Sequence, residues 1–502
     1  MNIQILWPVI DLHKGDNQFV GISLISAMLN QQGFASRVIA ADAKRIESKI
    51  DHDALTILAF STPTVYAQTY IELSRKLKRK GRIFSIFGGP HPTYFPDMIE
   101  TGGVDAICRG EGEYPMVELV EALSQGRPSH EIQNIWVKEN GTIFRNPLRP
   151  LIEDLDSLPL PDHEIFRRAV PNNLWQAVVM TSRGCPYHCT YCYNHVYREL
   201  YRGKGRMIRR RSVDHVIEEL KSIKAHKNYK FIRFLDDLFT LSPEWIEEFS
   251  EKYRKEIGLP FSCLVRANHI TPKMARELKT AGCRRVQMGL ESGDEEVRNK
   301  IFKRNLSEED IIQAARIIKA AGLKLVTGNI LGSPGTSLEQ DLKTLDLNMR
   351  IKPVYAGVSL LQPYPGTEIF EYARNLGMLD SAPAGLRETT VSRTSILKFK
   401  NRKEKDQIEN LQKLFFLPIE IPWSLPLVKA MIKLPANRIY HFFFSRWVNY
   451  CQYFRVIPPR IGWKNLWKRS KLLSGAYALL RQGRSLSAKT ESSEKNSGTT
   501  ST

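Results

Sequence analysis

A chain of 502 residues, 42% of them apolar, is long enough to form two to four globular domains. It contains no run of 18 uncharged apolar residues, which argues against a membrane-spanning helix, and its start, MNIQILWPVIDLHKG, lacks the features of a signal peptide. We therefore expect a cytoplasmic protein whose seven cysteines stay reduced and serve metal binding or catalysis rather than disulfides. The formal net charge of +20 predicts anionic partners.

The first 140 residues alternate short apolar strands with helical patterns. The expected strands are IQILWPV, RVIAAD, LTILAF, RIFSIFGG and VDAICRG, and the helix after the first of them ends at Gly33, a typical left-handed position. This alternation predicts an open, doubly wound α/β domain over residues 1–140. Residues 141–173, in which prolines are mixed with acidic residues, are expected to form a linker.

A second series of strands and helices begins at residue 174. Its expected strands are WQAVVM, FIRFL, FSCLV, RVQMGL, LVTGNIL and AGVSLL. The helices between them have recognisable start and stop signals, namely Ser242 before Pro243, the capping-box pairs Ser307–Asp310 and Ser337–Gln340, and the terminating glycines Gly282 and Gly322. Six such units in series predict a parallel β/α barrel over residues 174–380, which we assign as a partial barrel.

Polar or glycine-rich residues follow each of these six strands. The segments are TSRGC, DDLFT, RANHI, ESG, GSPGT and QPYPGT. Loops are often polar for no functional reason, but the carboxyl ends of parallel barrel strands meet at one rim, which is where active sites of such barrels form. The sequence therefore predicts an active site at this rim.

Three cysteines, Cys185, Cys189 and Cys192, lie within the eight residues that follow the first strand of the barrel. A structural zinc site needs four ligands, and His188 or His195 could supply the fourth, although the short loop disfavours His188. Incidental cysteines would be a coincidence at this density. An iron–sulfur cluster ordinarily takes four thiolates, so three thiolates leave one iron with an open position, which is useful only if a substrate binds there.

The spacing Cys-x3-Cys-x2-Cys after the first strand of a parallel barrel resembles the radical S-adenosylmethionine (radical SAM) superfamily. The resemblance implies that the three cysteines hold a 4Fe–4S cluster whose open iron binds the amino and carboxylate groups of S-adenosylmethionine. An external donor of the flavodoxin or ferredoxin type would supply the electron that cleaves this cosubstrate to a 5′-deoxyadenosyl radical. Tyr191, the aromatic residue before the last cysteine, matches the family pattern and is expected near the adenine, unless it only packs.

Other segments of the barrel resemble the cosubstrate-binding motifs of the same superfamily. In GLESG, Glu291 and Ser292 are expected at the ribose or methionine end, because a carboxylate accepts hydrogen bonds from hydroxyl and ammonium groups. In GNILG, Gly328 and Gly332 would let the backbone approach the adenine, although each could also be an ordinary turn glycine. Arg266 could pair with the carboxylate or could be solvated at the surface. Many members have Gly-Gly-Glu after the second strand; this chain has Asp236 and Asp237 instead, and one of these acids is expected to contact the ammonium group.

The N-terminal segments FSTPT, GGPHPT and RGEGE resemble the cobalamin-binding domain that precedes the barrel in one radical SAM branch. That branch includes the anaerobic magnesium-protoporphyrin monomethyl ester cyclase and cobalamin-dependent methyltransferases. The resemblance implies that Ser61, Gly88, Gly89 and His91 contact cobalamin, and that the glycine pair leaves room for its nucleotide tail. In DLHKGD, Asp11 and His13 fit the usual cobalt-ligating motif Asp-x-His-x-x-Gly, but the glycine, Gly15, comes one position too early. We therefore expect that the protein supplies no lower ligand to the cobalt. A domain that keeps this fold but has lost cobalamin is the alternative.

The resemblance fades beyond residue 380. Residues 381–484 are expected to form a basic, helical region, of which residues 421–484 contain twelve Lys or Arg, twelve aromatic residues and no acid. Such a composition suits a peripheral element on anionic lipid. A small helical cap over the barrel with its aromatics inward, or a nucleic-acid surface, which we consider a poor fit, are the alternatives. Residues 485–502 have almost no apolar content and are expected to be disordered.

The leading functional hypothesis is a cobalamin-dependent radical SAM enzyme that methylates an unactivated carbon of a hydrophobic small molecule, such as a lipid or a tetrapyrrole. An oxidative tetrapyrrole cyclase is the second hypothesis, and a non-catalytic iron–sulfur or corrinoid protein is the third. A tRNA methylthiolating enzyme would need further cysteines before the barrel, where only Cys108 occurs. An auxiliary cluster near the C-terminus is excluded, because Cys451 stands alone there.

Overall fold

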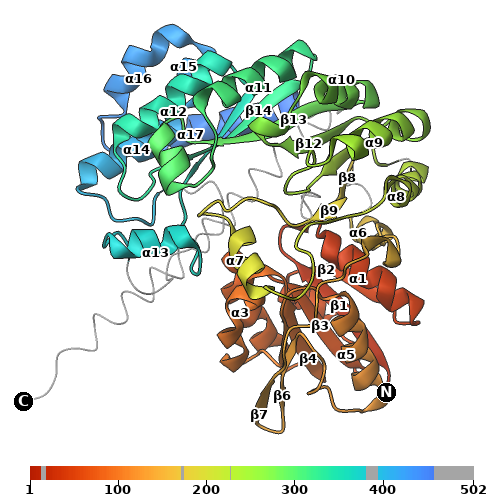
Figure 1. Ribbon diagram of the computed structural model, residues 1–502. Coiled ribbons are helices and arrows are strands. Elements are labelled where there is room, and N and C mark those ends of the chain that lie inside the picture. The colour runs from red at the N-terminus through yellow and green to blue at the C-terminus, as the bar shows by residue number, and fades with distance from the viewer. Residues whose placement is uncertain (13–17, 171–174, 227, 380–393, 457–502) are drawn as a thin grey trace, which may run out of the picture. The chain divides into compact units, whose positions relative to one another are not determined.

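The computed structural model describes residues 1–12, 18–170, 175–226, 228–379 and 394–456 (Figure 1). Residues 1–445 form one compact unit, and residue 446 begins a second one. The first unit contains a mixed N-terminal sheet, whose first five strands are parallel, and a second, fully parallel sheet, and a connecting segment joins them. His13 and residues 485–502, on which two of the sequence-based expectations rest, lie outside the described residues.

The N-terminal sheet has the strand order β2-β1-β3-β4-β5-β6-β7. Its strands are β1 (Ile3–Val9), β2 (Ser36–Ala40), β3 (Leu55–Ser61), β4 (Ile83–Gly88), β5 (Ala106–Cys108), β6 (Ile135–Glu139) and β7 (Thr142–Arg145). The first five are parallel, and the order reverses between β1 and β3. In open parallel sheets, ligands bind outside the carboxyl ends of the strands near such a reversal.

Helices cover both faces of this sheet, as the alternating pattern predicted. They are α1 (Val20–Gln31), α2 (Ala43–Glu47), α3 (Ala67–Leu77), α4 (Pro90–Tyr94) and α5 (Glu113–Gln125). One face packs its apolar side chains against α1 and α5, and the other against α2 and α3. The doubly wound fold is thus confirmed, and α1 is followed by Gly33 in the left-handed conformation.

The antiparallel hairpin of β6 and β7 was not predicted, and β7 lies in the stretch that we interpreted as a linker. Its turn is Asn140–Gly141, with both residues at positive φ, which is the chemistry of a tight hairpin turn. The rest of the connecting segment contains a short 3-10 turn at Leu155–Ser157 and helix α6 (Glu164–Ala169).

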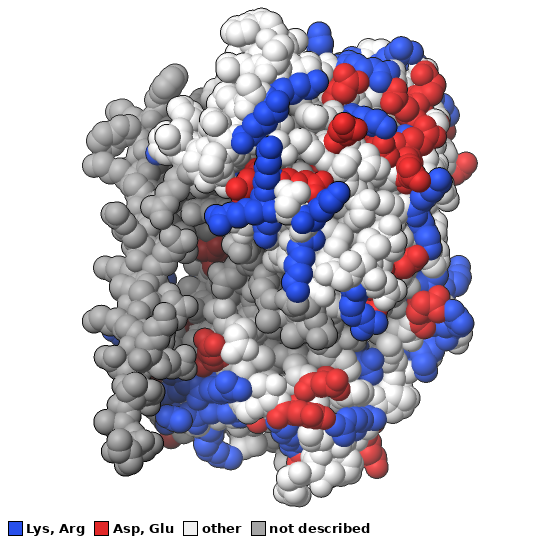
Figure 2. Space-filling model, turned by 90° about the vertical axis from the view of Figure 1, so that its left-hand side faces the viewer, with Lys and Arg blue, Asp and Glu red and all other residues white. Residues whose placement is uncertain are grey.

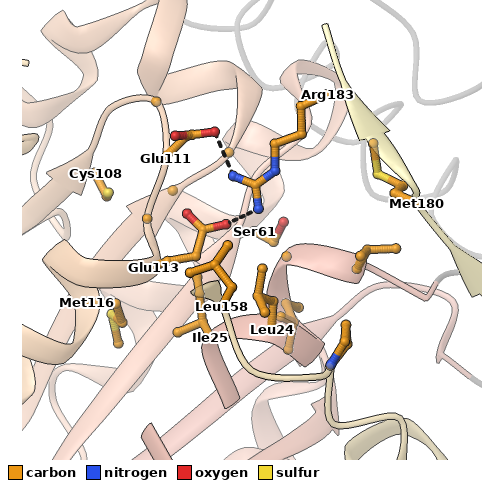
Figure 3. Close-up of a pocket in the computed structure, with 18 of the residues that line it drawn as sticks. Leu24, Ile25, Ser61, Cys108, Glu111, Glu113, Met116, Leu158, Met180 and Arg183 are labelled. Carbon is orange, nitrogen blue, oxygen red and sulfur yellow. Dashed lines mark hydrogen bonds and ion pairs between the residues drawn. The ribbon is translucent and has the colours of Figure 1, made fainter. Parts of the chain in front are cut away.

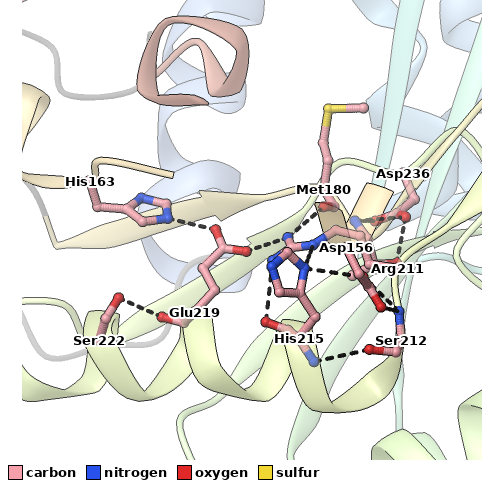
Figure 4. Close-up of polar contacts among 10 residues, drawn as sticks. Asp156, His163, Met180, Arg211, Ser212, His215, Glu219, Ser222 and Asp236 are labelled. Atoms are coloured by element: carbon pink, nitrogen blue, oxygen red, sulfur yellow. Dashed lines mark hydrogen bonds and ion pairs between the residues drawn. The ribbon is translucent and has the colours of Figure 1, made fainter. Parts of the chain in front are cut away.

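Buried polar contacts tie this connecting segment to the barrel (Figure 4). The His163 Nε2 atom lies 2.7 Å from Glu219 Oε1, and Arg211 pairs with the other carboxylate oxygen of Glu219. Although burial raises the pKa of Glu219, Arg211 and His163 hold that pKa below its usual value. The segment is therefore anchored by a charged network rather than by apolar packing alone.

The second sheet is parallel and open, with the order β15-β14-β13-β12-β11-β8. Its strands are β8 (Gln176–Val179), β11 (Phe231–Phe234), β12 (Phe261–Val265), β13 (Cys283–Glu291), β14 (Lys324–Leu331) and β15 (Tyr355–Leu360). Since neighbours in space are also neighbours in sequence, this is the expected β/α partial barrel. A two-stranded ribbon, β9 (Ser182–Arg183) with β10 (Arg209–Arg210), lies beside it.

The barrel helices begin and end near the predicted signals. They are α7 (Tyr193–Leu200), α8 (Val213–Ala225), α9 (Pro243–Glu256), α10 (Pro272–Ala281), α11 (Glu308–Ala320), α12 (Leu338–Ile351) and α13 (Glu368–Asn375). Ser242 caps α9, and both predicted capping boxes are formed at α11 and α12. Residues Val297–Ile301 form one turn of π-helix after β13.

The described part of the C-terminal region is helical between residues 402 and 456, whereas residues 381–393 and 457–484 of the predicted basic region lie outside the described residues. Its helices are α14 (Arg402–Leu414), α15 (Phe416–Glu420), α16 (Leu425–Met431) and α17 (Arg438–Tyr450), followed by a π-helical turn at Cys451–Val456. Helix α14 packs Ile408, Leu411 and Leu414 against the apolar residues of β14, β15 and α12. No helix among the described residues is both long and apolar enough to span a bilayer.

Candidate active site at two sheet edges

The three cysteines lie between β9 and α7, at the carboxyl end of β8, and all three are free thiols. Gly184, just before them, has φ +86°, and a Cβ atom there would lie 2.2 Å from Met207 O, so only glycine fits. The loop is fixed by Thr190, whose N–H and hydroxyl donate to Phe302 O and Ile301 O. Arg198 donates to Cys185 O at 2.6 Å.

Within the described ranges, no three His, Cys, Asp or Glu side chains converge closely enough to hold a single metal ion. A cuboidal cluster takes each thiolate on a different iron, so its cysteines need not converge on one point. Zinc is disfavoured further because both nitrogens of His195 contact backbone: Nδ1 lies 3.1 Å from Cys189 O, and Nε2 accepts from the Glu368 N–H. The donor set thus suits a three-thiolate cluster better than zinc, and that ligand set remains our prediction.

The two acids after β11 have different environments. Asp236 is buried and accepts hydrogen bonds from the Thr181 N–H at 3.0 Å, the Thr181 hydroxyl at 2.6 Å and the Ser182 hydroxyl at 2.5 Å. Asp237 is exposed to solvent, yet crowding by neighbouring atoms raises the pKa of its carboxyl, with a further contribution from Asp236. Asp236 therefore belongs to the fold, and Asp237 is the acid that a ligand can reach.

A buried guanidinium that the sequence analysis missed connects the cysteine loop to β13. Arg304 donates to Tyr191 OH at 2.5 Å and to Gly289 O at 2.6 Å, and its Nη1 lies 4.0 Å from Cys189 Sγ. Its neighbours Lys303 and Asn305 both have positive φ, a conformation that costs energy in non-glycine residues. Nothing in the local sequence marks Arg304, because its role depends on this unusual loop.

Glu291, at the end of β13, has φ +66° and lies at an irregularity in the pairing with β14. Its carboxylate is 3.5 Å from Arg304 Nη1. Burial raises the pKa of Glu291, and Arg304 and Tyr191 partly oppose this shift. A buried carboxyl on a strained backbone beside the cysteine loop is typical of a binding site rather than of a structural ion pair.

Three glycines form a row across neighbouring strands. Gly289 on β13 pairs with Gly328 on β14, which pairs with Gly357 on β15. Gly328 leaves open space above the backbone, whereas a Cβ atom on Gly289 would lie 2.5 Å from the Glu291 carboxylate and 3.2 Å from the Arg304 guanidinium, so these two side chains border the open strip. Gly357 was missed, although aligning the carboxyl halves of the three strands would have shown it.

The remaining predicted residues of the barrel have other neighbours. Arg266 is not at the surface: it is 5% exposed and its guanidinium lies 3.6 Å from the ring centroid of Tyr187 in the cysteine loop. The Ser292 hydroxyl accepts from the Asp294 N–H. A Cβ atom on Gly332 would meet Phe399 and Ile408, at 3.2 and 3.3 Å, so this glycine packs against the C-terminal region.

The N-terminal sheet ends in a cavity of about 500 Å³ rather than in interlocked side chains (Figure 3). Its walls include Ser61, Gly88 and Gly89 at the ends of β3 and β4. Deeper, it runs between one face of the sheet and helices α1 and α5, and its deeper lining consists of Trp7, Ile22, Ile25, Ala59, Ile86, Cys108 and Met116. Its volume is in the range of cofactor sites, and it suits an arm that enters the domain from a flat group at the edge.

The same cavity touches the barrel next to the cysteine loop. Gly184 and Asn194, which flank the cysteines, belong to its wall. Arg183 is paired with Glu111 at 2.6 Å and with Glu113 at 2.5 Å (Figure 3), and these are the two acids of RGEGE. Although burial raises the pKa of Glu111, Arg183 and Arg209 hold it below its usual value. The RGEGE segment thus fixes the cavity to the strand that leads into the cysteines.

His91 is not among the residues that line this cavity. Its N–H donates to Thr62 O, its ring lies 5.0 Å from that of Phe95, and burial lowers the pKa of its imidazole to about 4. The structure therefore brings Ser61, Gly88 and Gly89 together around the cavity, whereas His91 is not one of its lining residues.

Comparison with known proteins gives two family matches. Residues 7–120 match the B12 binding domain, and residues 179–347 match the radical SAM superfamily. An uncharacterized methyltransferase of Pyrococcus horikoshii is 31% identical over 370 residues, which cover 70% of this chain and 78% of the relative. The anaerobic magnesium-protoporphyrin IX monomethyl ester cyclase of Rubrivivax gelatinosus is 25% identical over 324 residues, which cover 62% of this chain and 56% of the relative.

Two solved structures share the fold. The cobalamin-dependent S-adenosylmethionine radical enzyme OxsB, with aqua-cobalamin and S-adenosylmethionine bound, has a TM-score of 0.65 at 17% identity, covering 89% of this chain and 71% of that one. The radical S-adenosylmethionine methyltransferase TsrM from Kitasatospora setae has a TM-score of 0.61 at 17% identity, and the match covers 76% of this chain and 78% of that one.

Proposed function

The chain belongs to the radical SAM enzymes that carry a cobalamin-binding domain, and we propose that it is a C-methyltransferase that acts on an unactivated carbon of a hydrophobic small molecule. Its cofactors are a 4Fe–4S cluster, S-adenosylmethionine and cobalamin, and its electrons come from an external donor. The observation that carries the proposal is that one and the same cavity is lined by Gly88 of the cobalamin-binding domain and by Gly184 and Asn194 beside the cysteines. A methyl carrier in this cavity would lie next to the source of the radical.

We assign the following roles to the barrel residues. Cys185, Cys189 and Cys192 would ligate the cluster, and Asp237 would accept hydrogen bonds from the ammonium group of S-adenosylmethionine, because Asp236 is already occupied. Glu291 would accept from a ribose hydroxyl, held in place by Arg304 and Tyr191. The glycine row from Gly289 to Gly357 would face the adenine.

We assign the cobalamin contacts to Ser61, Gly88 and Gly89, and leave His91 to the turn in which it packs. When bound, the cofactors supply the hydrogen-abstracting radical and the methyl group. The protein holds them in register through the Arg183 pairs with Glu111 and Glu113 and closes the cavity wall with apolar side chains, which exclude water.

The test is anaerobic incubation of the reconstituted full chain with methyl-labelled S-adenosylmethionine, a reductant and a membrane extract. We expect the label in an extractable lipid or tetrapyrrole, and none with the Cys192→Ala variant. Formation of 5′-deoxyadenosine with an oxidised, unlabelled product would favour the cyclase hypothesis. Cofactor binding without any turnover of S-adenosylmethionine would favour a corrinoid carrier and contradict the proposal.

We propose further that the C-terminal region holds the enzyme at an anionic membrane surface, where a hydrophobic substrate would be dissolved. Large apolar side chains are exposed on α16, α17 and the turns before them: Trp423 79%, Leu427 54%, Leu434 53%, Ile439 65%, Phe442 55% and Phe443 56%. Residues 421–445 include Lys429, Lys433 and Arg438 and no acid. Exposed aromatics beside cations and without acids are typical of interfacial elements.

Figure 2 shows the face that lies on the left of Figure 1. Lys and Arg gather over its centre, and the upper left of this face carries few charged side chains, whereas the upper right carries both acids and cations. An apolar tip with cations around it can insert between lipids while the cations meet the headgroups. The alternative of a cap with inward aromatics does not suit Trp423, Phe442 and Phe443.

Vesicle sedimentation tests this placement. The double variant Trp423→Ser/Phe442→Ser should bind anionic vesicles at least 10-fold more weakly than the wild type, because each inserted aromatic side chain contributes about 1.5–3 kcal/mol. Tyr372→Ser on α13, an exposed aromatic outside this region, is the matched control. High salt should release the wild type in part, since the Debye length falls to about 3 Å at 1 M. Binding to RNA but not to vesicles would contradict the proposal.

A further inference from the structure

Trp7 on β1 presents a buried donor to the cavity of the N-terminal domain. The side chain is 4% exposed, it lines the cavity, and among the residues that the structure describes its Nε1–H has no hydrogen-bond partner. A buried donor without a partner costs on the order of 1–3 kcal/mol, so such groups normally meet a ligand or a water. The other tryptophan of this sheet, Trp136, follows that norm and donates to Asn146 O at 3.0 Å.

The position of Trp7 defines what can reach it. Trp7 lies on the sheet face that packs against α1 and α5, and Ala59, Ile86 and Cys108 lie beside it on neighbouring strands. These side chains offer no charge and are small enough to leave the cavity open. A group that reaches Nε1 must therefore lie among apolar atoms and carry a hydrogen-bond acceptor where it meets Trp7.

Glu113 lines the same cavity and has the opposite chemistry. It is buried, one of its oxygens is paired with Arg183, and the other has no partner within the described part of the chain. A free carboxylate oxygen suits an amide N–H donor. The cavity lining thus offers one acceptor and one donor to a long ligand.

We infer that Trp7 is the residue that selects the lower base of cobalamin: its Nε1–H donates to the imidazole nitrogen of the nucleotide tail. This inference rests on the proposed function. That nitrogen can accept a hydrogen bond only when the base has left the cobalt, so the Trp7 contact would also favour the form in which the tail is extended into the domain. A cobamide whose lower base lacks an acceptor nitrogen would leave the Trp7 donor unpaired.

The test compares corrinoid binding by the full chain and by Trp7→Phe, which keeps an aromatic ring and removes only the donor. We expect Trp7→Phe to bind aquacobalamin about 3- to 10-fold more weakly, as for the loss of one hydrogen bond. It should bind cobinamide, which has no nucleotide tail, as the wild type does, and this also reports that the domain is folded. Trp136→Phe, which removes a partnered indole donor on β6, should change neither affinity.

A cobamide with a phenolic lower base gives the reciprocal measurement. Wild type should bind it more weakly than cobalamin by a similar factor, and Trp7→Phe should bind both equally. Equal losses of cobalamin and cobinamide in Trp7→Phe, or no loss of either, would overturn the inference while the proposed function stands. If the wild type bound neither corrinoid, the proposed function and the inference would both fall.

Discussion

The parallel strands of both large sheets end at a candidate cofactor site, but the two sites are built in different ways. At the barrel edge, polar side chains bind one another: Asp236 is held by Thr181 and Ser182, and Arg304 joins Tyr191 to Gly289. At the edge of the N-terminal sheet, glycines and small apolar side chains surround a cavity, and Trp7 Nε1 has no partner among the described residues.

The difference follows from how each cofactor is held. A cluster is attached by a few strong metal–thiolate bonds, so the surrounding residues need only fix three cysteines and neutralise charge. A large, non-covalently bound cofactor needs room and contact area, which glycine and alanine at strand ends leave open. Substitutions at the barrel edge should therefore act through lost bonds, and those at the N-terminal edge through lost space.

The largest effect is expected from the cysteines. Replacing Cys185, Cys189 or Cys192 with Ala should abolish the cluster and all cleavage of S-adenosylmethionine, because each removes one of three ligands. Anaerobically purified wild type should contain about four irons and four sulfides per chain. Iron and sulfide analysis with electron paramagnetic resonance checks this.

The control is Cys263→Ala, a buried free cysteine on β12. It should keep the full iron content. A wild type that carried only zinc, or a Cys189→Ala variant that kept all its iron, would show that the three cysteines do not ligate an iron–sulfur cluster. The proposed difference between the two cofactor sites would then be wrong.

The cluster loop and the strands could be predicted from sequence because they rest on local signals. The cysteine spacing, the capping boxes and the apolar runs each lie within a few residues. Arg304 could not be predicted, because it contacts Cys189 and Tyr191 across more than one hundred residues of chain. The β6–β7 hairpin could have been predicted from Asn140–Gly141, and was missed because prolines after it dominated the interpretation.

The second effect concerns the cavity at the edge of the N-terminal sheet. Gly88→Leu should weaken cobalamin binding on the order of 10- to 100-fold, as expected for overfilling a fitted site. Gly88 is the sharper choice than Gly89, since Gly89 has φ +89° and any side chain there is strained. A Cβ atom on Gly88 meets only Cys108, at 3.8 Å, so the domain should still fold.

Absorbance titration of cobalamin into the reconstituted full chain measures this change. Gly102→Leu is the matched control, because its Cβ atom would also meet a single neighbour at 3.8 Å but the site is exposed and outside the cavity. Unchanged cobalamin affinity in Gly88→Leu would mean that the cofactor does not occupy the cavity beside Gly88.

The third effect separates the paired acids of the barrel edge. Asp237→Asn should weaken S-adenosylmethionine binding roughly 10- to 100-fold, the range for a hydrogen bond to a charged group, without changing stability. Asp236→Asn should instead destabilise the fold by about 1–3 kcal/mol, because its new amide N–H groups would oppose those of Thr181.

Calorimetric titration with S-adenosylmethionine and urea denaturation distinguish the two variants. The comparison is sharpened if each variant shows only one of the two changes. An Asp236→Asn variant of normal stability that failed only to bind S-adenosylmethionine would contradict the assignment of Asp237.

Two of the predicted glycines show that a sequence motif alone does not tell which residue faces a ligand. Gly328 and Gly332 look alike in GNILG, but Gly328 lies in the row between Gly289 and Gly357, whereas Gly332 packs against Phe399 and Ile408. Strand register decides which glycine faces a ligand, and register depends on partners that lie far away in the sequence.

The last effect concerns Asp341, a buried carboxyl of the barrel whose contribution to stability depends on pH. It lies on α12, is 4% exposed, and accepts the Gly332 N–H at 3.0 Å. Burial raises the pKa of this carboxyl to about 8, and the charge of Glu404 adds to the shift. In the unfolded chain the pKa is about 3.9, so the folded state binds the extra proton between these values. Stability should therefore be greatest at low pH within this window and fall as the pH rises towards 8, by at most about 1.4 kcal/mol per unit.

Asp341→Asn keeps an oxygen for Gly332 and cannot ionise, so its stability should lack this decline. Urea denaturation at pH 6, 7, 8 and 9 measures it, with Asp346→Asn, an exposed carboxyl on the same helix, as the control. Parallel pH curves for wild type and Asp341→Asn would show that Asp341 stays ionised in the folded state. The barrel would then contain a buried carboxylate whose charge no neighbouring cation compensates within the described part of the chain.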